Sequence, residues 1–98
     1  MKIIALEKHV EGVTPEDFTP YLKAEAARVW ELYQEGVIRE LYFRADRTDA
    51  VIVLECSGTG QAEDVLSTLP LINEGLIAFD LIPLAPYPGF SRLFATES

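Results

Sequence analysis

The fold of this chain is constrained most by two runs rich in β-branched and aromatic residues, which a short polar turn separates. The runs cover residues 37–45 and 50–57, and the turn covers residues 46–49 with Asp at both ends. β-Branched and aromatic residues favour strands. Asp favours turns because its carboxylate bonds nearby backbone N–H groups. The stretch therefore predicts a β-hairpin that the rest of the fold must accommodate.

The two faces of this hairpin differ in character. Side chains alternate between faces along a strand, so one predicted face is apolar, with Arg39 at its start, and carries Leu41, Phe43, Ile52, Leu54 and Cys56. The other face mixes charged and aromatic residues with valines: Glu40, Tyr42, Arg44, Val51, Val53 and Glu55. A fully solvent-exposed face would carry mainly polar side chains, whereas this face also carries valines and a tyrosine. We therefore expect other protein surface to cover it.

Two further strands and two helices flank the hairpin in a recognisable order. A first strand over 2–9 precedes a helix start at Thr14-Pro15, where Thr caps and Pro takes the first helical position. A main helix is predicted over 20–35, ended by Gly36 as a left-handed cap. A second helix (61–69) and a last strand (76–84) follow. The order β-α-β-β-α-β predicts a ferredoxin-like α+β fold, an antiparallel four-stranded sheet with both helices on one face.

The same alternation assigns the remaining side chains to faces. The helix-facing rows are expected to hold Ile4, Leu6, Ile77, Phe79 and Leu81, and the buried stripe of the main helix Leu22, Ala26, Val29, Trp30 and Tyr33. The opposite face would add Glu7, His9, Ala78, Asp80 and Ile82. Because that face carries too much apolar surface for a monomer, we expect a homodimer or higher oligomer in which a second copy covers it.

Length and charge narrow the possibilities further. With 98 residues the chain forms a single domain, here 1–84, and its net charge of −8 disfavours both nucleic-acid and anionic-membrane partners. No apolar run is long enough to span a membrane, and the start of the chain lacks a secretion signal, so we expect a cytoplasmic protein. The single Cys56 is expected to be a small buried hydrophobe.

The end of the chain differs from the domain before it. Residues 85–98 contain prolines at 86 and 88 and large apolar residues at 87, 90, 93 and 94. Proline excludes a central strand or a helix there. We expect an extended arm that packs on a neighbouring subunit.

The junction between the main helix and the hairpin resembles the muconolactone isomerase family. The residues that carry the resemblance are Leu22-Lys23-Ala24, Glu35-Gly36, Arg39, Leu41 with Tyr42, Glu55, and Leu69-Pro70-Leu71, which together span roughly 20–82. The resemblance implies a ferredoxin-like fold assembled through a dimeric α/β barrel. It also implies an enzyme that moves a proton in a small lactone carboxylate without a cofactor.

Proton transfer next to a carbonyl needs a base, an acid and a group that holds an anion. Glu7 and the only histidine, His9, share a face of the first strand and could shuttle a proton. Glu25 follows the Leu-Lys-Ala run and is either a third catalytic acid or a surface partner of Arg28. Glu7, Glu55 and Asp80 could converge on one face. The spacing of these groups matches no metal-ligand motif, so no metal is expected.

An arginine supplies the anion-holding group. Arg39 would start its strand on the apolar side, where its guanidinium needs a partner, either Glu35 or a substrate carboxylate. Trp30 and Tyr33 are either core aromatics or walls of the ligand site, and Tyr42 and Glu55 are expected at the ligand with them.

Three functions therefore remain open for the chain. The first is an isomerase acting on a small anionic molecule from lactone or aromatic degradation. The second is a non-catalytic oligomeric protein that binds a small molecule. The third, on the same superfold, is a small monooxygenase or a haem-handling protein with His9 as the ligand.

Overall fold

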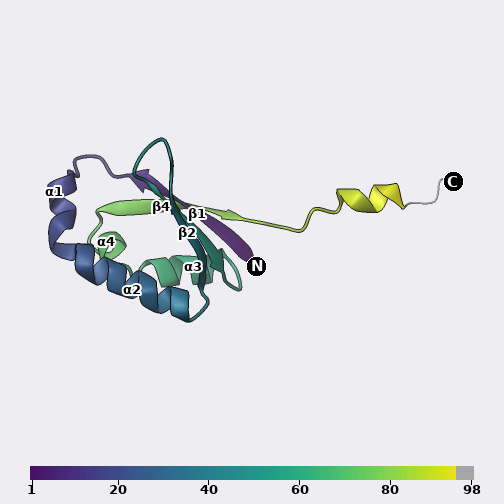
Figure 1. Cartoon of the computed structure of the whole chain (residues 1–98), viewed down its shortest axis with the longest axis horizontal. Helices are drawn as coiled ribbons and strands as arrows, with labels where there is room; N and C mark the ends of the chain where they lie inside the picture. Colours follow the sequence, from purple (N-terminus) through teal and green to yellow (C-terminus); the bar gives the residue numbers. More distant parts are fainter. Residues whose placement is uncertain (95–98) are drawn as a thin grey trace.

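A computed structural model describes residues 1–94 of the chain (Figure 1). Its strands are β1 (Lys2–His9), β2 (Ile38–Phe43), β3 (Ala50–Glu55) and β4 (Ile77–Pro83). Its helices are α1 (Pro15–Phe18), α2 (Leu22–Gln34), α3 (Thr59–Leu66) and α4 (Pro70–Asn73), with 3₁₀ turns η1 (Thr19–Tyr21) and η2 (Gly89–Leu93). The predicted order of elements is confirmed, whereas α4 was not predicted and the helices begin and end a few residues from the expected positions.

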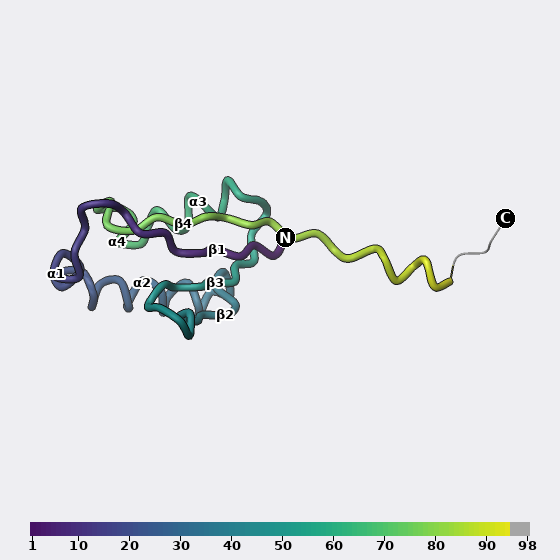
Figure 2. The backbone as a smooth tube through the Cα atoms, turned by 90° about the horizontal axis from the view of Figure 1, so that it is seen from above, coloured from purple at the N-terminus to yellow at the C-terminus, as the bar shows by residue number. Residues whose placement is uncertain are grey.

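The four strands form one antiparallel sheet in the order β2-β3-β1-β4. The helices lie against one face of this sheet, and α2 and α3 together cover it (Figures 1 and 2). This is the predicted ferredoxin-like arrangement. Gly36, with φ of +81°, ends α2 in the left-handed conformation that the sequence indicated, since the N–H of Val37 returns to the carbonyl of Leu32 at 3.0 Å.

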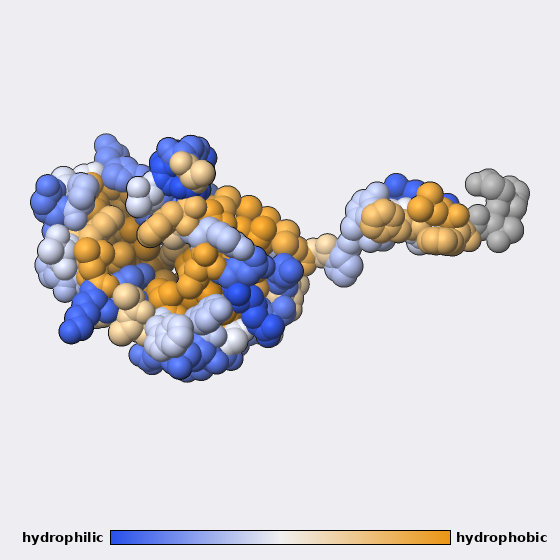
Figure 3. All heavy atoms as spheres, in the orientation of Figure 1, coloured by the Kyte–Doolittle hydropathy of each residue, from blue (hydrophilic) through white to orange (hydrophobic). Residues whose placement is uncertain are grey.

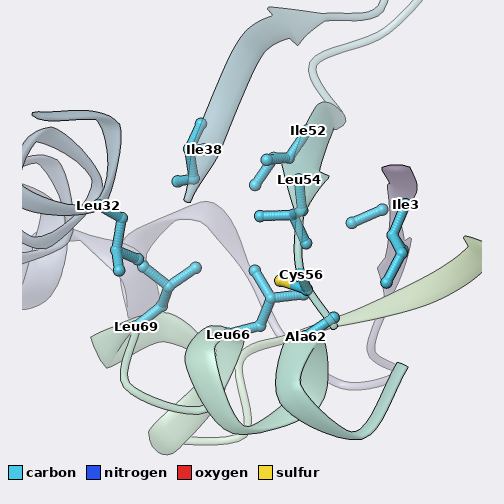
Figure 4. Packing of buried hydrophobic residues seen from close by; sticks show 10 residues of the cluster. Ile3, Leu32, Ile38, Ile52, Leu54, Cys56, Ala62, Leu66 and Leu69 are labelled. Carbon is cyan, nitrogen blue, oxygen red and sulfur yellow. The ribbon is translucent and has the colours of Figure 1, made fainter. Parts of the chain in front are cut away.

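The core lies between the helices and the middle of the sheet (Figure 4). Its fully buried members come from all parts of the chain: Ile3, Ala5, Leu32, Ile38, Leu54, Ala62 and Leu69. Cys56 is buried among them, as expected, and burial raises the pKa of its thiol. These side chains touch across the layers, so they hold α2 and α3 onto the sheet.

The first strand faces the opposite way from the prediction. Ile3 pairs with Leu54 and Ala5 with Ile52, so Ile3, Ala5 and Glu7 share the helix-facing side. Ile4 and Leu6 lie instead on the open face, opposite Val53 and Val51. The prediction was wrong because β1 carries apolar residues on both faces. It put the larger side chains, Ile4 and Leu6, beneath the helices, whereas the structure buries Ile3 and Ala5 there.

The buried stripe predicted for the main helix is also wrong. Leu32 is the buried residue of α2, and Trp30 and Tyr33 are exposed by 58% and 47%. Leu22 and Ala26 are exposed as well, and Val29 is half-buried. The reason is geometric: α2 contacts the core mainly through Leu32, and the rest of its predicted stripe faces a groove.

The edge strand β2 contributes to the same groove. Its register against β3 shifts between Ile38 and Glu40, which breaks the alternation at Arg39. Leu41 and Phe43 lie on the predicted side, opposite Ile52 and Ala50, but they remain exposed at the sheet edge. The hairpin therefore forms as predicted, while part of its apolar row lines open space.

Beyond β4 the chain leaves the body of the domain (Figure 2). Leu84 donates its N–H to the carbonyl of Lys2 at 2.9 Å, and the following residues run outward to η2. This stretch is not extended throughout, contrary to the prediction, because the 3₁₀ turn η2 covers Gly89–Leu93 after Pro88. Its packing on a neighbouring subunit stays a prediction, and residues 95–98 lie outside the described part of the chain. No helix among residues 1–94 has the length and apolarity to cross a membrane.

Candidate functional site

An apolar cavity of about 370 Å³ opens between α2 and the helix-facing side of the sheet (Figure 3). Strands, helix and the start of α4 all contribute to its wall, which is made by Glu7, Leu22, Glu25, Val29, Leu41, Tyr42, Phe43, Ala50, Ile52, Leu71, Ile77 and Phe79. Two of these residues are acids and the others are largely apolar. The cavity therefore combines an apolar wall with two carboxylates, as small-molecule sites commonly do.

Glu7 enters this cavity from β1. Its Oε1 accepts the backbone N–H of Ala50 at 2.9 Å, which fixes the carboxylate beside the start of β3. Burial raises the pKa of Glu7, the hydrogen bond from Ala50 opposes that effect, and the nearby Asp49 raises the pKa further. The prediction that Glu7 lies on the open face is wrong, because β1 is turned over. Its side chain instead faces the helix layer.

Glu25 enters the same cavity from α2. Its Oε1 accepts the N–H of Leu71 at 3.0 Å, so this acid joins α2 to α4. Burial raises the pKa of Glu25, the bond from Leu71 lowers it, and the negative charge of Glu7 raises it again. The alternative in which Glu25 pairs with Arg28 is not realised, since Arg28 contacts Glu31 at 3.2 Å and Thr68 at 2.9 Å.

The two carboxyls therefore form an acidic pair in one apolar cavity. Each has one oxygen fixed by a backbone N–H, which leaves the second oxygen available to a ligand. Since Glu7 raises the pKa of Glu25, a proton on one favours the ionised form of the other. Such a pair can supply an acid and a base at the same time.

A second, more open groove of about 540 Å³ adjoins the cavity. The two share Val29, Leu41 and Tyr42 in their walls. On the groove side, Trp30 and Tyr33 stack with ring centres 5.9 Å apart and planes at 26°. These two aromatics line the groove and are not core residues. Their contact with a ligand stays a prediction.

Arg39 lines this groove, whereas the two carboxyls line the adjoining cavity. Its Nε donates to the carbonyl of Gly36 at 2.5 Å, which anchors the side chain at the end of α2. Glu35, the structural partner considered for it, is not the acceptor. Arg39 is exposed, and the register of β2 is irregular at this residue, so the alternation that predicted its face does not hold there. Its guanidinium remains able to bind an anion.

His9 lies in a smaller cavity of about 150 Å³ on the other side of Glu7. His9, Thr14 and Asp49 contribute to its wall with Glu7. By register His9 pairs with Ile77 and Glu7 with Phe79, so both acid and imidazole share the helix-facing side of β1. The prediction that they share a face is confirmed, although the face is the other one.

Three other predicted groups lie away from the cavity. Glu55 accepts from the terminal ammonium of Met1 at 2.5 Å, and this contact lowers its pKa. Asp80 pairs with Lys8 at 2.9 Å. Tyr42 borders the groove, but its hydroxyl donates to Glu40 at 2.7 Å on the open face. The expected convergence of Glu7, Glu55 and Asp80 is therefore wrong, because β1 places Glu7 on the opposite face from the other two.

Several members of the site were not predicted. The backbone N–H groups of Ala50 and Leu71 hold the two carboxyls, and Phe43 and Phe79 form apolar wall. Pro70, which belongs to the Leu-Pro-Leu run of the family resemblance, begins the unpredicted helix α4. Among residues 1–94, no group of three or more His, Cys, Asp or Glu side chains is arranged to hold a metal ion.

The chain is similar to known proteins in both sequence and fold. The family model described as muconolactone delta-isomerase matches residues 2–89. A crystal structure of muconolactone isomerase is similar, with a TM-score of 0.72 and 21% identity over 90% of this chain and 92% of that one. A search of curated proteins found no match.

A second solved structure is also similar. It is 5-chloro-2-hydroxyhydroquinone dehydrochlorinase from Burkholderia phenoliruptrix in complex with 2,5-dihydroxybenzoquinone. Its TM-score is 0.66, with 15% identity over 87% of this chain and 94% of that one. At these identities, both structures support the fold of the chain and leave its chemistry to the residues of the cavity.

Proposed function

Because this chain belongs to the muconolactone delta-isomerase family, we propose that it catalyses proton transfer within a small unsaturated lactone that carries a carboxylate. The observation that carries this proposal is the pair Glu7 and Glu25, two carboxyls with raised pKa facing one apolar cavity. The family suggests the reaction, and the pair supplies groups suited to it.

One carboxyl acts as the base in this reaction and the other acts as the acid. An ionised carboxylate removes a proton from a carbon next to the carbonyl, and the C–H electrons spread into the conjugated system. A protonated carboxyl then delivers a proton to a different carbon, which completes the shift of the double bond. A carboxyl whose pKa is raised toward neutral pH is the better acid or base for this step. The apolar wall contributes by strengthening these charge interactions.

The residues that line the groove support a substrate with a ring and a carboxylate. Arg39 can hold the substrate carboxylate through its guanidinium fork while Trp30 and Tyr33 pack on the ring. The reacting carbons then extend toward Glu7 and Glu25, along the wall that the groove and cavity share. A neutral lactone would lose the pairing with Arg39, so we expect it to bind more weakly.

His9 can connect the pair with solvent. Glu7 borders both the apolar cavity and the small cavity that contains His9. We therefore assign His9 a proton-exchange role between Glu7 and water. Replacing His9 by Ala should lower kcat more than it changes KM, and added imidazole should restore part of the rate. A loss that imidazole leaves unchanged, with KM raised instead, would contradict this role.

A second copy of the chain should cover the open face of the sheet. Ile4, Leu6, Val51 and Val53 lie side by side there, joined by Ile82, which is exposed. Because this row lies outside the core of one copy, sheet-to-sheet packing would bury it. Replacement of Val53 by Asp should then give smaller particles in sedimentation. A wild-type protein that sediments as a 10.9 kDa monomer at micromolar concentration would overturn this part of the proposal.

The test of the reaction uses NMR in deuterated water with muconolactone and related unsaturated lactone carboxylates. Both a shifted double bond and incorporated deuterium are visible there. Glu7→Gln and Glu25→Gln should each lower the rate by about 10²–10⁴-fold, the usual contribution of a positioned acid or base. Glu11→Gln is the matched control, because Glu11 is exposed in the loop after β1 and lies outside the cavity.

Three outcomes are informative. Loss of rate in the two cavity variants with retention in Glu11→Gln supports the proposal. Equal rates in all three variants would refute the role of the pair. Binding of the lactones without isomerisation or deuterium uptake would instead support the alternative of a non-catalytic binding protein.

A further inference from the structure

The turn between β2 and β3 carries charged side chains that the proposed reaction does not use. It lies at the same end of the sheet as the end of β1 (Figure 1). Four of its residues, within 44–49, form two ion pairs: Arg44 with Asp46 at 2.7 Å, and Arg47 with Asp49 at 2.6 Å. The two acids differ in burial, because the side chain of Asp46 is 64% exposed and that of Asp49 only 21%.

Asp49 is held by its backbone at the border of the candidate site. Its carbonyl accepts the N–H of Arg44 at 2.9 Å, and its own N–H donates to the carbonyl of Arg47 at 2.9 Å. The next residue, Ala50, donates its N–H to Glu7. Asp49 and Glu7 also line the same small cavity of about 150 Å³. The fold therefore fixes a further carboxylate beside Glu7, with Arg47 as its counter-charge.

The surroundings of Glu25 are different. Among residues 1–94, the charged side chains that line the apolar cavity are Glu7 and Glu25. Arg28, three residues further along α2, contacts Glu31 and Thr68 instead of Glu25. The acidic pair is therefore asymmetric, because one member has the turn carboxylate beside it and the other has mainly apolar wall.

This asymmetry decides which carboxyl holds a proton more firmly. Burial raises the pKa of Glu7, and the negative charge of Asp49 raises it further, because a neighbouring anion disfavours ionisation. Two more titratable groups face Glu7, namely Glu25 across the apolar cavity and His9 in the small cavity. Glu25 acts in the same direction as Asp49, whereas a protonated His9 would favour the ionised form of Glu7.

We propose that Asp49 is a positioning residue that keeps the proton of the acidic pair on Glu7, so that Glu7 acts as the acid and Glu25 as the base. Arg47 sets the strength of this effect, because its ion pair offsets part of the charge of Asp49. The two roles rest on the proposed function, whereas the order in which the two carboxyls titrate is a property of the protein without substrate.

The test follows the carboxyl groups by NMR in protein labelled with ¹³C at the glutamate side-chain carboxyls. Glu7→Gln and Glu25→Gln each remove one signal and so assign the two resonances. In the wild-type protein the Glu7 signal should have its titration midpoint at higher pH than the Glu25 signal. Asp49→Asn should move the Glu7 midpoint to lower pH, because it removes the neighbouring negative charge.

Replacing the counter-charge should have the opposite effect. Arg47→Gln should move the Glu7 midpoint to higher pH, and this rise should disappear when Asp49→Asn is also present, because the effect passes through Asp49. Asp46→Asn is the matched control. It removes the same charge from the same turn at an exposed residue that lines neither cavity, so the Glu7 midpoint should stay close to that of wild type.

The opposite signs separate a charge effect from damage to the turn. A turn that lost its structure in both variants would shift the Glu7 midpoint in one direction only. An Asp49→Asn protein whose Glu7 midpoint is unchanged or raised would overturn the proposal. A wild-type protein in which Glu25 titrates at higher pH than Glu7 would overturn it as well.

The pH dependence of turnover tests the assigned roles. The alkaline limb of the kcat/KM profile reports loss of the proton from the acid of the free enzyme. This limb should move to lower pH in Asp49→Asn together with the Glu7 midpoint, and a limb that stays in place would show that Glu7 is not the acid. Lactones that are not isomerised at any pH would refute the proposed function, while the titrations would still show whether Asp49 controls Glu7.

Discussion

Replacing Leu54 by Ala tests the packing that holds the candidate site together. Leu54 is 0% exposed near the end of β3 and pairs with Ile3 on one side and Ile38 on the other. Both neighbours are themselves buried and held in the sheet. The space left by the lost carbons cannot collapse easily, so we expect a cost within the upper part of the usual range, about 3–4 kcal/mol.

This free energy converts into a melting temperature. Unfolding entropy near the midpoint is about 2.1 cal/mol/K per residue, or roughly 200 cal/mol/K for a chain of this length. A loss of 3–4 kcal/mol should therefore lower Tm by about 15–20 °C. Circular dichroism at one fixed protein concentration measures it, because assembly would make Tm depend on concentration.

Leu22→Ala is the matched control for this measurement. It removes the same atoms from a leucine that is 52% exposed at the rim of the cavity, where water fills the space. We expect a cost below about 1 kcal/mol, or less than about 5 °C. If Leu54→Ala lowered Tm by no more than Leu22→Ala, the assignment of the core to this face of the sheet would be refuted.

Three further predictions concern the site and the core. Glu25→Gln should raise stability at neutral pH, where wild type carries a partly buried carboxylate of raised pKa. That advantage should vanish as pH falls below the ordinary carboxyl pKa, because Glu25 is then protonated in both the folded and the unfolded state. Denaturant titrations in which the variant and the wild type are equally stable at neutral pH would contradict this prediction. Arg39→Lys should raise KM for lactone carboxylates about tenfold with kcat retained, since Lys lacks the bidentate fork. An unchanged KM would exclude Arg39 from binding the carboxylate. Cys56 should react with a thiol reagent only after unfolding, because it is buried, and equally fast labelling of the native protein would disprove its burial.

Local sequence determined the elements of this protein. Polar turn residues between two β-prone runs produced the hairpin, and Gly36 ended α2 with the left-handed conformation that its missing side chain allows. The alternation in β3 correctly placed Ile52 and Leu54 inside, because polar and apolar residues there are distinct enough to define the helix-facing side. Interactions between residues close together in the sequence are enough to produce these features.

The faces of β1 and α2 were decided by packing between elements. Residues 3–6 of β1 are apolar at both alternations, so only the register Ile3 to Leu54 settles which pair is inside. In α2, Trp30 and Tyr33 have the spacing of core residues. They line a groove because the helix contacts the core through Leu32.

The candidate site depends on tertiary structure most of all. Glu7 stands on a strand and Glu25 on a helix, and no local pattern connects them. They line one cavity because the helices cover the sheet, and each is then held by the backbone of a third element, Ala50 of β3 or Leu71 of α4. The raised pKa of both carboxyls is a product of that burial, which the chain acquires only when the helices cover the sheet.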